Sequence, residues 1–361
     1  MESIILLIVL FLSTTFGQNK AQIDSINQLL IKLPHNSQLA VAIINKDTVS
    51  YYGAMNLNGT IEVIDNHNRI FEIGSITKVM TSTILANLVY EGKISLDDPL
   101  QDHVPYKLKR PKKDDVTVTV QMLSNHSSGL TSMPSGMILD LLFKPKNPYV
   151  NYDLPRMEKY FKKKMKMNRT PGESSLYSNI GVGYLGHVLG YVAEKPYKDL
   201  LDQYVIKKYD MISTTLDRNL IGDRLVKGVD KKGKVVSNWD LNAFAPAGGV
   251  LSTVKDLAHF AQAHFGNDSA LEMQMKKTAQ LTQESSFFGE KIDIGLGWLI
   301  FYDKEGNAIY WHNGGTGGYS SDMSISVKNQ KSVVILSNVS VDVKETRQYQ
   351  DLNFTLLSLI E

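Results

Sequence analysis

The segment from Phe71 to Lys78 reads Phe-Glu-Ile-Gly-Ser-Ile-Thr-Lys, and an apolar-periodic run, Val79 to Tyr90, follows it at once. That run predicts a helix, on which residues i and i+3 share a face, so the Ser75 hydroxyl and the Lys78 amine would lie one turn apart. Free backbone N–H groups and the helix dipole would favour an anion beside Ser75. Burial would disfavour the charged form of Lys78, so that its neutral amine would accept the serine proton. The spacing predicts an activated nucleophile.

A second Ser-x-x-Lys pattern runs from Ser252 to Lys255 and is followed by Asp256. Here Thr253 and Asp256 have the spacing of a capping box, which predicts the start of a helix that continues to Phe265. Because a two-letter pattern is a weak signal by itself, the rest of the chain must decide between a structural and a catalytic role for each copy.

The composition is that of a globular protein, with 43% hydrophobic and 21% charged residues in a chain of 361. This length predicts one large domain or two intimate ones. A formal net charge of +2 argues against an extended surface for nucleic acid. Two lysine clusters, at residues 162–164 and 231–234, are predicted to be solvated surface.

The N-terminus resembles a secretory signal peptide, because residues 4–12 are apolar and a Ser-Thr-Thr-Phe-Gly-Gln stretch follows them. We expect a signal peptide over residues 1–18 and an exported protein, periplasmic or secreted; an uncleaved anchor is the alternative, although the apolar run is short for a membrane span. Cysteine is absent, which excludes disulfides and Cys-ligated metals. His259 and His264 lie five apart on a predicted helix and therefore not on one face, so neither a metal nor a cofactor is expected.

Strand patterns occur near both ends of the chain, and helical patterns occur between them. The predicted strands span residues 39–45, 48–52, 297–302, 308–311, 321–327 and 332–336, and terminal helices are predicted around 23–33 and 343–357. The sequence therefore predicts an α+β fold, with an antiparallel sheet built from both chain ends and flanked by helices, and a largely helical inserted lobe. The sheet lobe would hold residues 19–80 and 245–361, the helical lobe 81–244, and the cleft between them the site.

A Tyr-Ser-Asn stretch at residues 177–179 comes just before a predicted helix. Tyr177 would shuttle a proton if nearby cations lowered its pKa, and Asn179 would donate its amide to a substrate or accept from Lys78. The alternative is a tyrosine packed in a loop and an asparagine that caps the helix. A similar Tyr-Val-Asn at 149–151 is interpreted as a decoy.

A glycine-rich segment from His312 to Ser320 interrupts two predicted strands. Its glycines would let the backbone lie close against a ligand, and a strand edge there would pair with a peptide-like substrate. The alternative is a flexible hairpin loop. A second His-x-Gly, at 264–266, lies at a helix end, where glycine is a normal stop.

The chain resembles the serine β-lactamase and penicillin-binding-protein superfamily in three ordered motifs, Ser75-x-x-Lys78, Tyr177-Ser-Asn179 and His312-x-Gly314. It is most similar to the branch of class C β-lactamases, soluble DD-peptidases and related esterases. The resemblance covers about residues 35–340, and includes the stretches 92–99, 122–130, 247–253, 295–298 and 333–338; the second of these resembles the family's LLSHTSGL segment. Ser252 falls at a helix start of the family pattern, so the resemblance does not make it a nucleophile.

The resemblance implies a role for each matched residue. Ser75 would be the acylated nucleophile, and Lys78 its base or base partner. Tyr177 would relay protons. The substrate would be bound by Asn179, His312, Gly314 and Gly315, with the backbone N–H groups of Ser75 and Gly315 forming the oxyanion hole.

One motif departs from the class C pattern, which has Lys-Thr-Gly where this chain has His312-Asn313-Gly314. An imidazole that can be neutral near pH 7 replaces a permanent cation, and Asn313 replaces a hydroxyl. Both changes weaken the expected grip on the carboxylate that β-lactams and D-Ala-D-Ala peptides share. Histidine occurs at this position in DD-peptidases and esterases of the branch, so hydrolysis is still expected.

We therefore expect a serine hydrolase that forms a covalent acyl-enzyme with a β-lactam or a D-Ala-D-Ala-type peptide amide. A carboxylesterase for small acyl esters and a catalytically silent, penicillin-binding-like sensor module are the alternatives. The partners would be small-molecule or peptide substrates, with no nucleic acid and no membrane span after signal removal. The sequence contains no Gly-x-Ser-x-Gly elbow, His-Glu-x-x-His or P-loop that would point to another enzyme class.

Overall fold

The computed structural model describes residues 19–137, 143, 146–281 and 291–361. The expected signal peptide, residues 1–18, lies outside this part of the chain. Within it, no helix combines the length and the apolar character that a membrane crossing requires.

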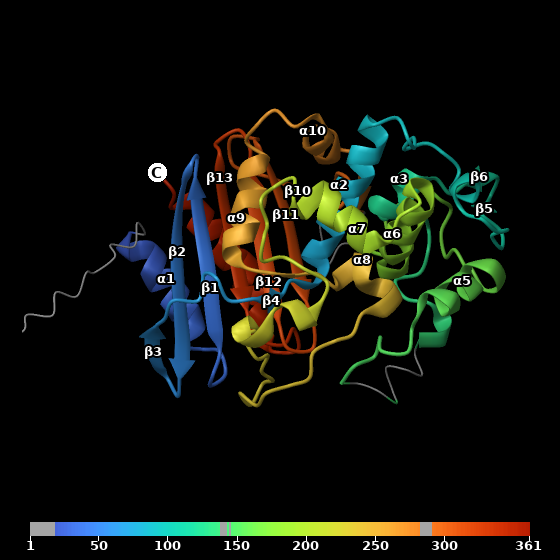
Figure 1. The fold of residues 1–361 in the computed structure, drawn as a ribbon. Helices are drawn as coiled ribbons and strands as arrows, with labels where there is room; N and C mark the ends of the chain where they lie inside the picture. The colour runs from blue at the N-terminus through green and yellow to red at the C-terminus, as the bar shows by residue number, and fades with distance from the viewer. Residues whose placement is uncertain (1–18, 138–142, 144–145, 282–290) are drawn as a thin grey trace, which may run out of the picture.

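The described residues form a nine-stranded antiparallel sheet in the order β3-β2-β1-β13-β12-β11-β10-β9-β8 (Figure 1). The first and last strands of the chain are neighbours at its middle, where Ala42 of β1 lies opposite Val334 of β13. This confirms the predicted α+β fold with a sheet built from both chain ends. The strands are β1 Gln38–Asn45, β2 Thr48–Leu57, β3 Thr60–Val63, β8 Ala279–Leu281, β9 Ile292–Ile294, β10 Leu299–Tyr302, β11 Ala308–Gly315, β12 Ser320–Ser326 and β13 Lys331–Ser337.

Helices cover both faces of the sheet, which is why its central strands are buried on both sides. Helix α9 (Val254–Ala263) packs on β1 and β13 and stands in front of them in Figure 1. On the opposite face, α11 (Tyr349–Ser358) packs on β12 and β13, and α1 (Lys20–Leu30) packs beside it on β2. The sheet is therefore held rigidly between two apolar layers.

The inserted half of the chain is largely helical and lies beside the sheet (Figure 1). Its central element is α2 (Thr77–Tyr90), which is buried continuously from Thr77 to Leu88 and contacts α6, α8 and α10. A helix enclosed on all sides cannot shift easily, so the start of α2 is a fixed position between the two halves. The other α-helices with bounds in the described residues are α3 Val120–Ser124, α5 Leu154–Lys163, α6 Asn179–Ala193, α7 Tyr197–Leu201, α8 Ala245–Gly248 and α10 Ser269–Met275.

The structure differs from the predicted elements mainly in its short strands. The predicted strands 39–45 and 48–52 pair as a hairpin whose turn is residues 46–47, with Lys46 at φ 55°. Strands β3, β8 and β9 were not predicted, nor were the two-stranded ribbons formed by β4 (Phe71–Glu72) with β7 (Leu251–Ser252) and β5 (Lys112–Lys113) with β6 (Val116–Thr117). The interruption predicted at 312–320 is wrong in part, because β11 continues to Gly315 and only residues 316–319 form the turn. The limits of the two lobes stay a prediction.

Candidate active site

Ser75 lies in the helical turn Gly74–Ile76, which leads directly into α2. Gly74 has φ +50°, and a Cβ at this position would lie 2.4 Å from the Gly315 nitrogen. Both the left-handed backbone and the close approach require glycine. Ser75 is partly exposed, whereas its neighbours Gly74 and Ile76 are buried. The turn thus presents one hydroxyl at the surface of a buried segment.

Lys78 is fully buried, and its Nζ lies 2.8 Å from Ser75 Oγ. The same nitrogen donates to the carbonyl oxygen of Ala247 at 2.7 Å. No ion pair of Lys78 is found among the described residues, and burial lowers its pKa to about 7. The neutral amine, which can accept a proton, is then accessible at neutral pH.

Tyr177 lies on the other side of this pair. Its phenol hydrogen-bonds with the Ser75 hydroxyl, and Lys78 Nζ lies 5.0 Å from the centroid of its ring. Burial raises the pKa of Tyr177 well above its usual value, an effect larger than the lowering by Ser75. The condition set above for a proton shuttle, a pKa lowered by nearby cations, is therefore not met. At neutral pH the phenol stays protonated and acts as a donor.

His126 packs against Tyr177, although no role was predicted for it beyond its place in a segment that resembles the family. Its Nδ1 accepts from the Ser178 N–H at 3.2 Å, and its carbonyl oxygen accepts from the Leu176 N–H at 2.8 Å. The rings of His126 and Tyr177 lie 4.5 Å apart. His126 is 2% exposed and has φ 63°. One residue thus holds the backbone on both sides of Tyr177 and packs on its ring.

His312 is buried at the same place, with its ring centroid 6.3 Å from that of Tyr177. Its Nδ1 lies 2.6 Å from the Asn313 carbonyl oxygen, and this acceptor fixes the proton on Nδ1. Burial, and then the charge of Lys78, lower the pKa of His312 to about 3. The ring is therefore neutral at pH 7, and its Nε2 carries a lone pair that has no hydrogen-bond partner among the described residues.

Strand β11 brings Gly314 and Gly315 against the nucleophile turn. A Cβ on Gly314 would lie 2.7 Å from the Ser75 nitrogen, so only glycine permits this approach. Across the hairpin, Thr316 N–H donates to Tyr319 O at 2.9 Å. Because hydrogen bonds alternate along an antiparallel strand, the Gly315 N–H points away from β12, to the side where Ser75 lies.

A cavity of about 80 Å³ lies beside Ser75, and Asn179, the first residue of α6, lines it. Its wall carries no charged side chain and is mostly apolar and aromatic, with Tyr149, Trp239, Leu241, Phe244, Ala247, Gly248, Gly315 and Thr316. The Tyr149 ring lies 5.3 Å from that of Trp239 and 5.2 Å from that of Phe244. Tyr149, interpreted from the sequence as a decoy, therefore belongs to the wall of the candidate site.

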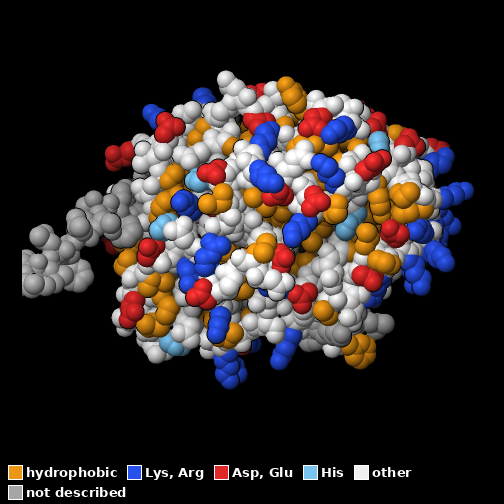
Figure 2. Space-filling model, in the orientation of Figure 1, with side chains coloured by type: hydrophobic (Ala, Val, Ile, Leu, Met, Phe, Trp, Pro, Cys, Tyr) orange, Lys and Arg blue, Asp and Glu red, His pale blue; other side chains and the backbone are white. Residues whose placement is uncertain are grey.

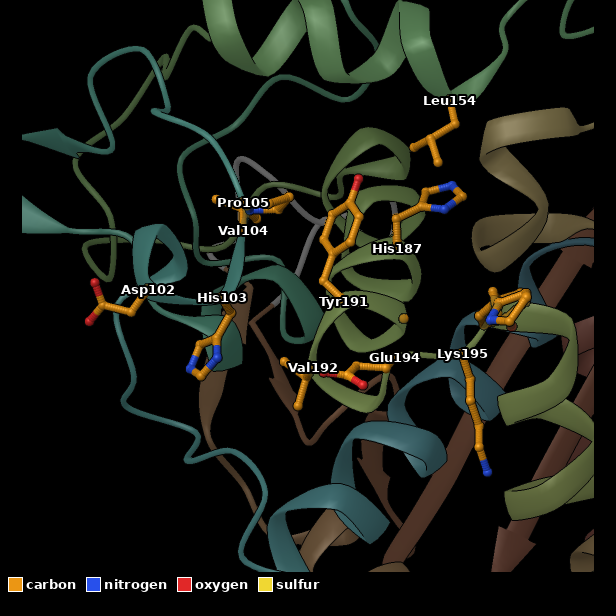
Figure 3. Close-up of a pocket in the computed structure, with 13 residues that line it drawn as sticks. Asp102, His103, Val104, Pro105, Leu154, His187, Tyr191, Val192, Glu194 and Lys195 are labelled. Carbon is orange, nitrogen blue, oxygen red and sulfur yellow. The ribbon is translucent and has the colours of Figure 1, made fainter.

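A larger hollow of about 710 Å³ lies elsewhere, on the helical half. Figure 3 shows His187 and Tyr191 projecting from α6 into this region, with Asp102 and His103 on a neighbouring segment. None of the residues proposed for catalysis lines this hollow. In the described part of the chain, no group of three or more His, Asp or Glu side chains is arranged to hold a metal ion.

The structure thus brings together all seven residues selected from the sequence, and adds His126 and an aromatic wall. Comparison with known proteins agrees with this geometry. The model of the Beta-lactamase family matches residues 26–355, so the chain belongs to the Beta-lactamase family. Membership of this family supports a serine hydrolase.

Individual relatives are distant in sequence and similar in fold. The chain is 26% identical over 322 residues to the D-alanyl-D-alanine-carboxypeptidase/endopeptidase AmpH of Escherichia coli K12, a match that covers 80% of this chain and 81% of that protein. It is also 26% identical to a Beta-lactamase of Pseudomonas fluorescens, over 77% of this chain and 74% of that protein. Among solved structures, the Beta-lactamase/D-alanine carboxypeptidase of Yersinia pestis has a TM-score of 0.77 at 22% identity, over 95% of this chain and 100% of that one. The octameric penicillin-binding protein homologue of Pyrococcus abyssi has a TM-score of 0.78 at 23% identity, over 94% and 76%.

Proposed function

We propose that the protein hydrolyses β-lactams or D-Ala-D-Ala-type peptide amides through a covalent acyl-enzyme on Ser75. The observation that carries this proposal is the buried Lys78, whose Nζ lies 2.8 Å from Ser75 Oγ and whose pKa is lowered to about 7 by burial. A neutral amine at hydrogen-bond distance from a partly exposed hydroxyl is the arrangement that makes serine a nucleophile.

Acylation would proceed by attack of Ser75 Oγ on the substrate carbonyl carbon while the hydroxyl proton moves to Lys78 Nζ. The backbone N–H groups of Ser75 and Gly315 would stabilise the oxyanion. As the bond to the leaving group breaks, the leaving nitrogen or oxygen would take a proton from the Tyr177 phenol, and Lys78 would return its proton to Tyr177. Because burial raises the pKa of Tyr177, its phenol is protonated in the resting enzyme, which leaves Lys78 as the base.

Deacylation would consume one water molecule. The water oxygen would attack the ester carbon of the acyl-enzyme, with Lys78 accepting a proton from water and Ser75 Oγ regaining one as it leaves. The products would be a carboxylic acid and the free enzyme. Asn179, which lines the cavity beside Ser75, is proposed to orient the substrate.

An ester substrate is the second candidate, and the state of His312 favours it. A neutral ring whose Nδ1–H donates to the Asn313 carbonyl oxygen offers no cation to a substrate carboxylate. Esters and amides that have no such carboxylate would bind equally well to a site with neutral His312 as to one with a cationic lysine. The silent sensor module is the third possibility, and the close Ser75–Lys78–Tyr177 contacts speak against it.

The cavity beside Ser75 would take the acyl part of the substrate. Tyr177 must lie next to the leaving group to protonate it, and Tyr177, Lys78 and His312 do not line the cavity, whereas Ser75 and Gly315 do. A cavity of roughly 150 Å³ holds benzene. The 80 Å³ here therefore favours a short alkyl group, such as the methyl of a D-alanyl residue.

The location of the protein and the limits of its two lobes are also part of the proposal, which rests on the sequence and on the relatives. We propose export to the periplasm or the exterior after removal of residues 1–18, and two lobes with the limits given above. The homologous AmpH is named as a carboxypeptidase and endopeptidase, activities that suit a cell-envelope substrate.

Intact-protein mass spectrometry tests the proposed chemistry. The protein is incubated separately with a fluorescent penicillin, a D-Ala-D-Ala peptide and p-nitrophenyl acetate, and then quenched in acid. We expect a mass increase equal to one acyl group, located by peptide mapping on Ser75, and turnover of at least one substrate. Acylation at another residue, or none with any of the three, would contradict the proposal.

A further inference from the structure

Positive charge gathers at one end of the helical half, away from Ser75. Residues 107–113 and 159–169 contain eleven of the 39 Lys and Arg residues and none of the 37 Asp and Glu residues. The rest of the chain therefore has 28 basic against 37 acidic residues, a net charge of −9. Figure 2 shows basic side chains projecting from the right-hand edge, where Figure 1 places α5, β5 and β6. We call these two segments the basic end.

The fold brings the two segments of the basic end together, although about fifty residues separate them. The Lys109 N–H donates to the Phe161 carbonyl oxygen at 2.9 Å, and Lys113 Nζ donates to the Asn168 carbonyl oxygen at 3.2 Å. Within the basic end, the sequence predicted a solvated surface for the lysines at 162–164. The structure joins that cluster to a second one that the sequence did not connect with it.

Most of this charge is free to meet an external anion. Nine of the eleven basic residues are exposed, and Lys113 and Arg169 are partly exposed. In the described part of the chain, two of the eleven form ion pairs, Lys112 with Asp115 at 3.3 Å and Lys162 with Glu158 at 2.7 Å. Concentrated like charge of this kind creates a positive potential that attracts polyanions.

The chemistry of the basic end fits phosphate groups arranged on a surface. Nine of its eleven cations are lysines, which act as point charges toward phosphate and do not impose a bidentate geometry. Its aromatic residues, Tyr160 and Phe161, are buried and so unavailable for stacking on bases, and Lys162 covers the ring of the adjacent Tyr106 at 3.9 Å. Its side chains project outward (Figure 2), which suits contact with a plane.

We propose that the basic end docks the protein on the phosphate headgroups of an anionic phospholipid bilayer. Docking would be electrostatic, since the exposed side chains are charged, and would fall with salt as the screening length shortens. It would hold the hydrolase at the membrane surface by its helical half. This surface is separate from the catalytic residues, so docking does not depend on the proposed function.

Vesicle co-sedimentation of the full chain tests the proposal. Vesicles of phosphatidylcholine alone are compared with vesicles that contain 30% phosphatidylglycerol, at low salt and at 0.5 M NaCl. We expect binding to the anionic vesicles at low salt and its loss at high salt. The triple variant Lys163→Gln/Lys164→Gln/Lys166→Gln should bind about 100-fold more weakly, at about fivefold for each charge removed. Lys107→Gln/Lys109→Gln/Lys112→Gln should lose a similar amount, because both segments form one surface.

The matched control is Lys231→Gln/Lys232→Gln/Lys234→Gln, which removes three exposed lysines from the other cluster and should leave binding unchanged. All variants carry the same N-terminal segment, so binding by that segment is equal in all of them and does not affect the comparison between variants. Binding through that segment would also appear with vesicles of phosphatidylcholine alone. Circular dichroism and ester hydrolysis in solution verify that the variants fold. Equal losses in all three variants, or binding to immobilised polyphosphate without binding to anionic vesicles, would overturn the proposal.

Discussion

The two Ser-x-x-Lys copies of this chain share a pattern and differ in every physical property that matters for catalysis. Ser75 lies in a helical turn that leads directly into α2, so Lys78 follows it by one turn and reaches its hydroxyl. Ser252 lies in the short strand β7, and Thr253 then caps α9 by accepting from the Asp256 N–H. The chain therefore changes direction between Ser252 and its lysine.

The environments of the two serines differ as well. Ser252 is fully buried, and its hydroxyl lies 2.8 Å from that of Thr214. Lys255 is partly exposed, whereas Lys78 is sealed from water. Desolvation, which makes the Lys78 amine a base, is thus absent from the second copy. The comparison teaches that the helical turn and the burial of the lysine define the motif, and the letters alone do not.

Removing each serine gives the largest expected contrast. Ser75→Ala should lower kcat/KM by about 10⁴-fold or more and abolish labelling by a fluorescent penicillin, because no other group would replace the nucleophile. Ser252→Ala should leave kcat/KM within about twofold and lower the free energy of unfolding by about 1 kcal/mol, through loss of its buried contacts with the Thr214 hydroxyl and the Thr253 carbonyl oxygen. Steady-state kinetics and urea unfolding measure both. An inactive Ser252→Ala enzyme would reverse the assignment.

Removing each lysine comes next. Lys78→Ala should reduce kcat by about 10²- to 10⁴-fold, the usual contribution of a general base, while Lys255→Ala should have no effect. In the unaltered enzyme the active form has neutral Lys78, so kcat/KM should fall about tenfold per pH unit below pH 7 and level off above it.

The acid limb of that profile can be assigned to Lys78 because its neighbours titrate elsewhere. Burial lowers the pKa of His312 to about 3 and that of His126 well below its usual value, so neither changes charge between pH 5 and 8. A profile that is flat from pH 5 to 8 would show that Lys78 is not the base.

Replacing His126 should lower activity less than replacing Ser75 or Lys78, because His126 acts by positioning Tyr177 beside these two residues. His126→Ala removes the acceptor for the Ser178 N–H and the ring packed on Tyr177, and should lower kcat by about 10- to 100-fold with less change in KM. His126→Asn should restore most of the activity, because asparagine tolerates positive φ and its side-chain oxygen can accept the same hydrogen bond.

A matched control for His126 is His264→Ala, which removes another buried histidine, packed against Trp298. It should lower the melting temperature and leave kcat unchanged. If His126→Ala behaves in the same way, its role is structural only.

The aromatic wall should give the smallest effect, a change in selectivity. Arg218, which is paired with Glu72 at 2.9 Å, holds the Trp239 carbonyl oxygen and so fixes this part of the wall. Trp239→Ala should raise the kcat/KM ratio of p-nitrophenyl octanoate to acetate by about tenfold, because it enlarges the cavity. Tyr90→Ala, an exposed aromatic residue at the far end of α2, should leave the ratio unchanged. An unchanged ratio in Trp239→Ala would place the acyl group elsewhere.

The fold and the selected site residues could be predicted because their sequence patterns lie within short segments or follow one another in a fixed order along the chain. Strand β1 has an apolar run bounded by a turn, and the spacing of Ser75 and Lys78 holds within a single helical turn. The three motifs occur in the order that the family requires. Strands such as β3 and β9 are short and make much of their contact with distant neighbours, so their own residues carry little strand signal.

Features that depend on distant contacts could not be predicted. The burial of His312, and hence its neutral state, depends on how β11 packs against the turn at Gly74. Tyr149 and Trp239 meet across ninety residues of sequence. His126 lies in the stretch 122–130 that resembles a family segment, but its contacts with the backbone on both sides of Tyr177 arise only in the folded chain.

The pairing of β1 with β13 also governs how the molecule can be completed. The inner edge of β1 finds its partner only when residues 331–337 are present, almost 290 residues later. A chain truncated before β13, or still emerging during synthesis, exposes an apolar strand edge that is open to aggregation. Because this pairing joins residues that are far apart in the sequence, we expect slow folding. The sheet beside the Ser75 turn is complete only after the last strand has been added.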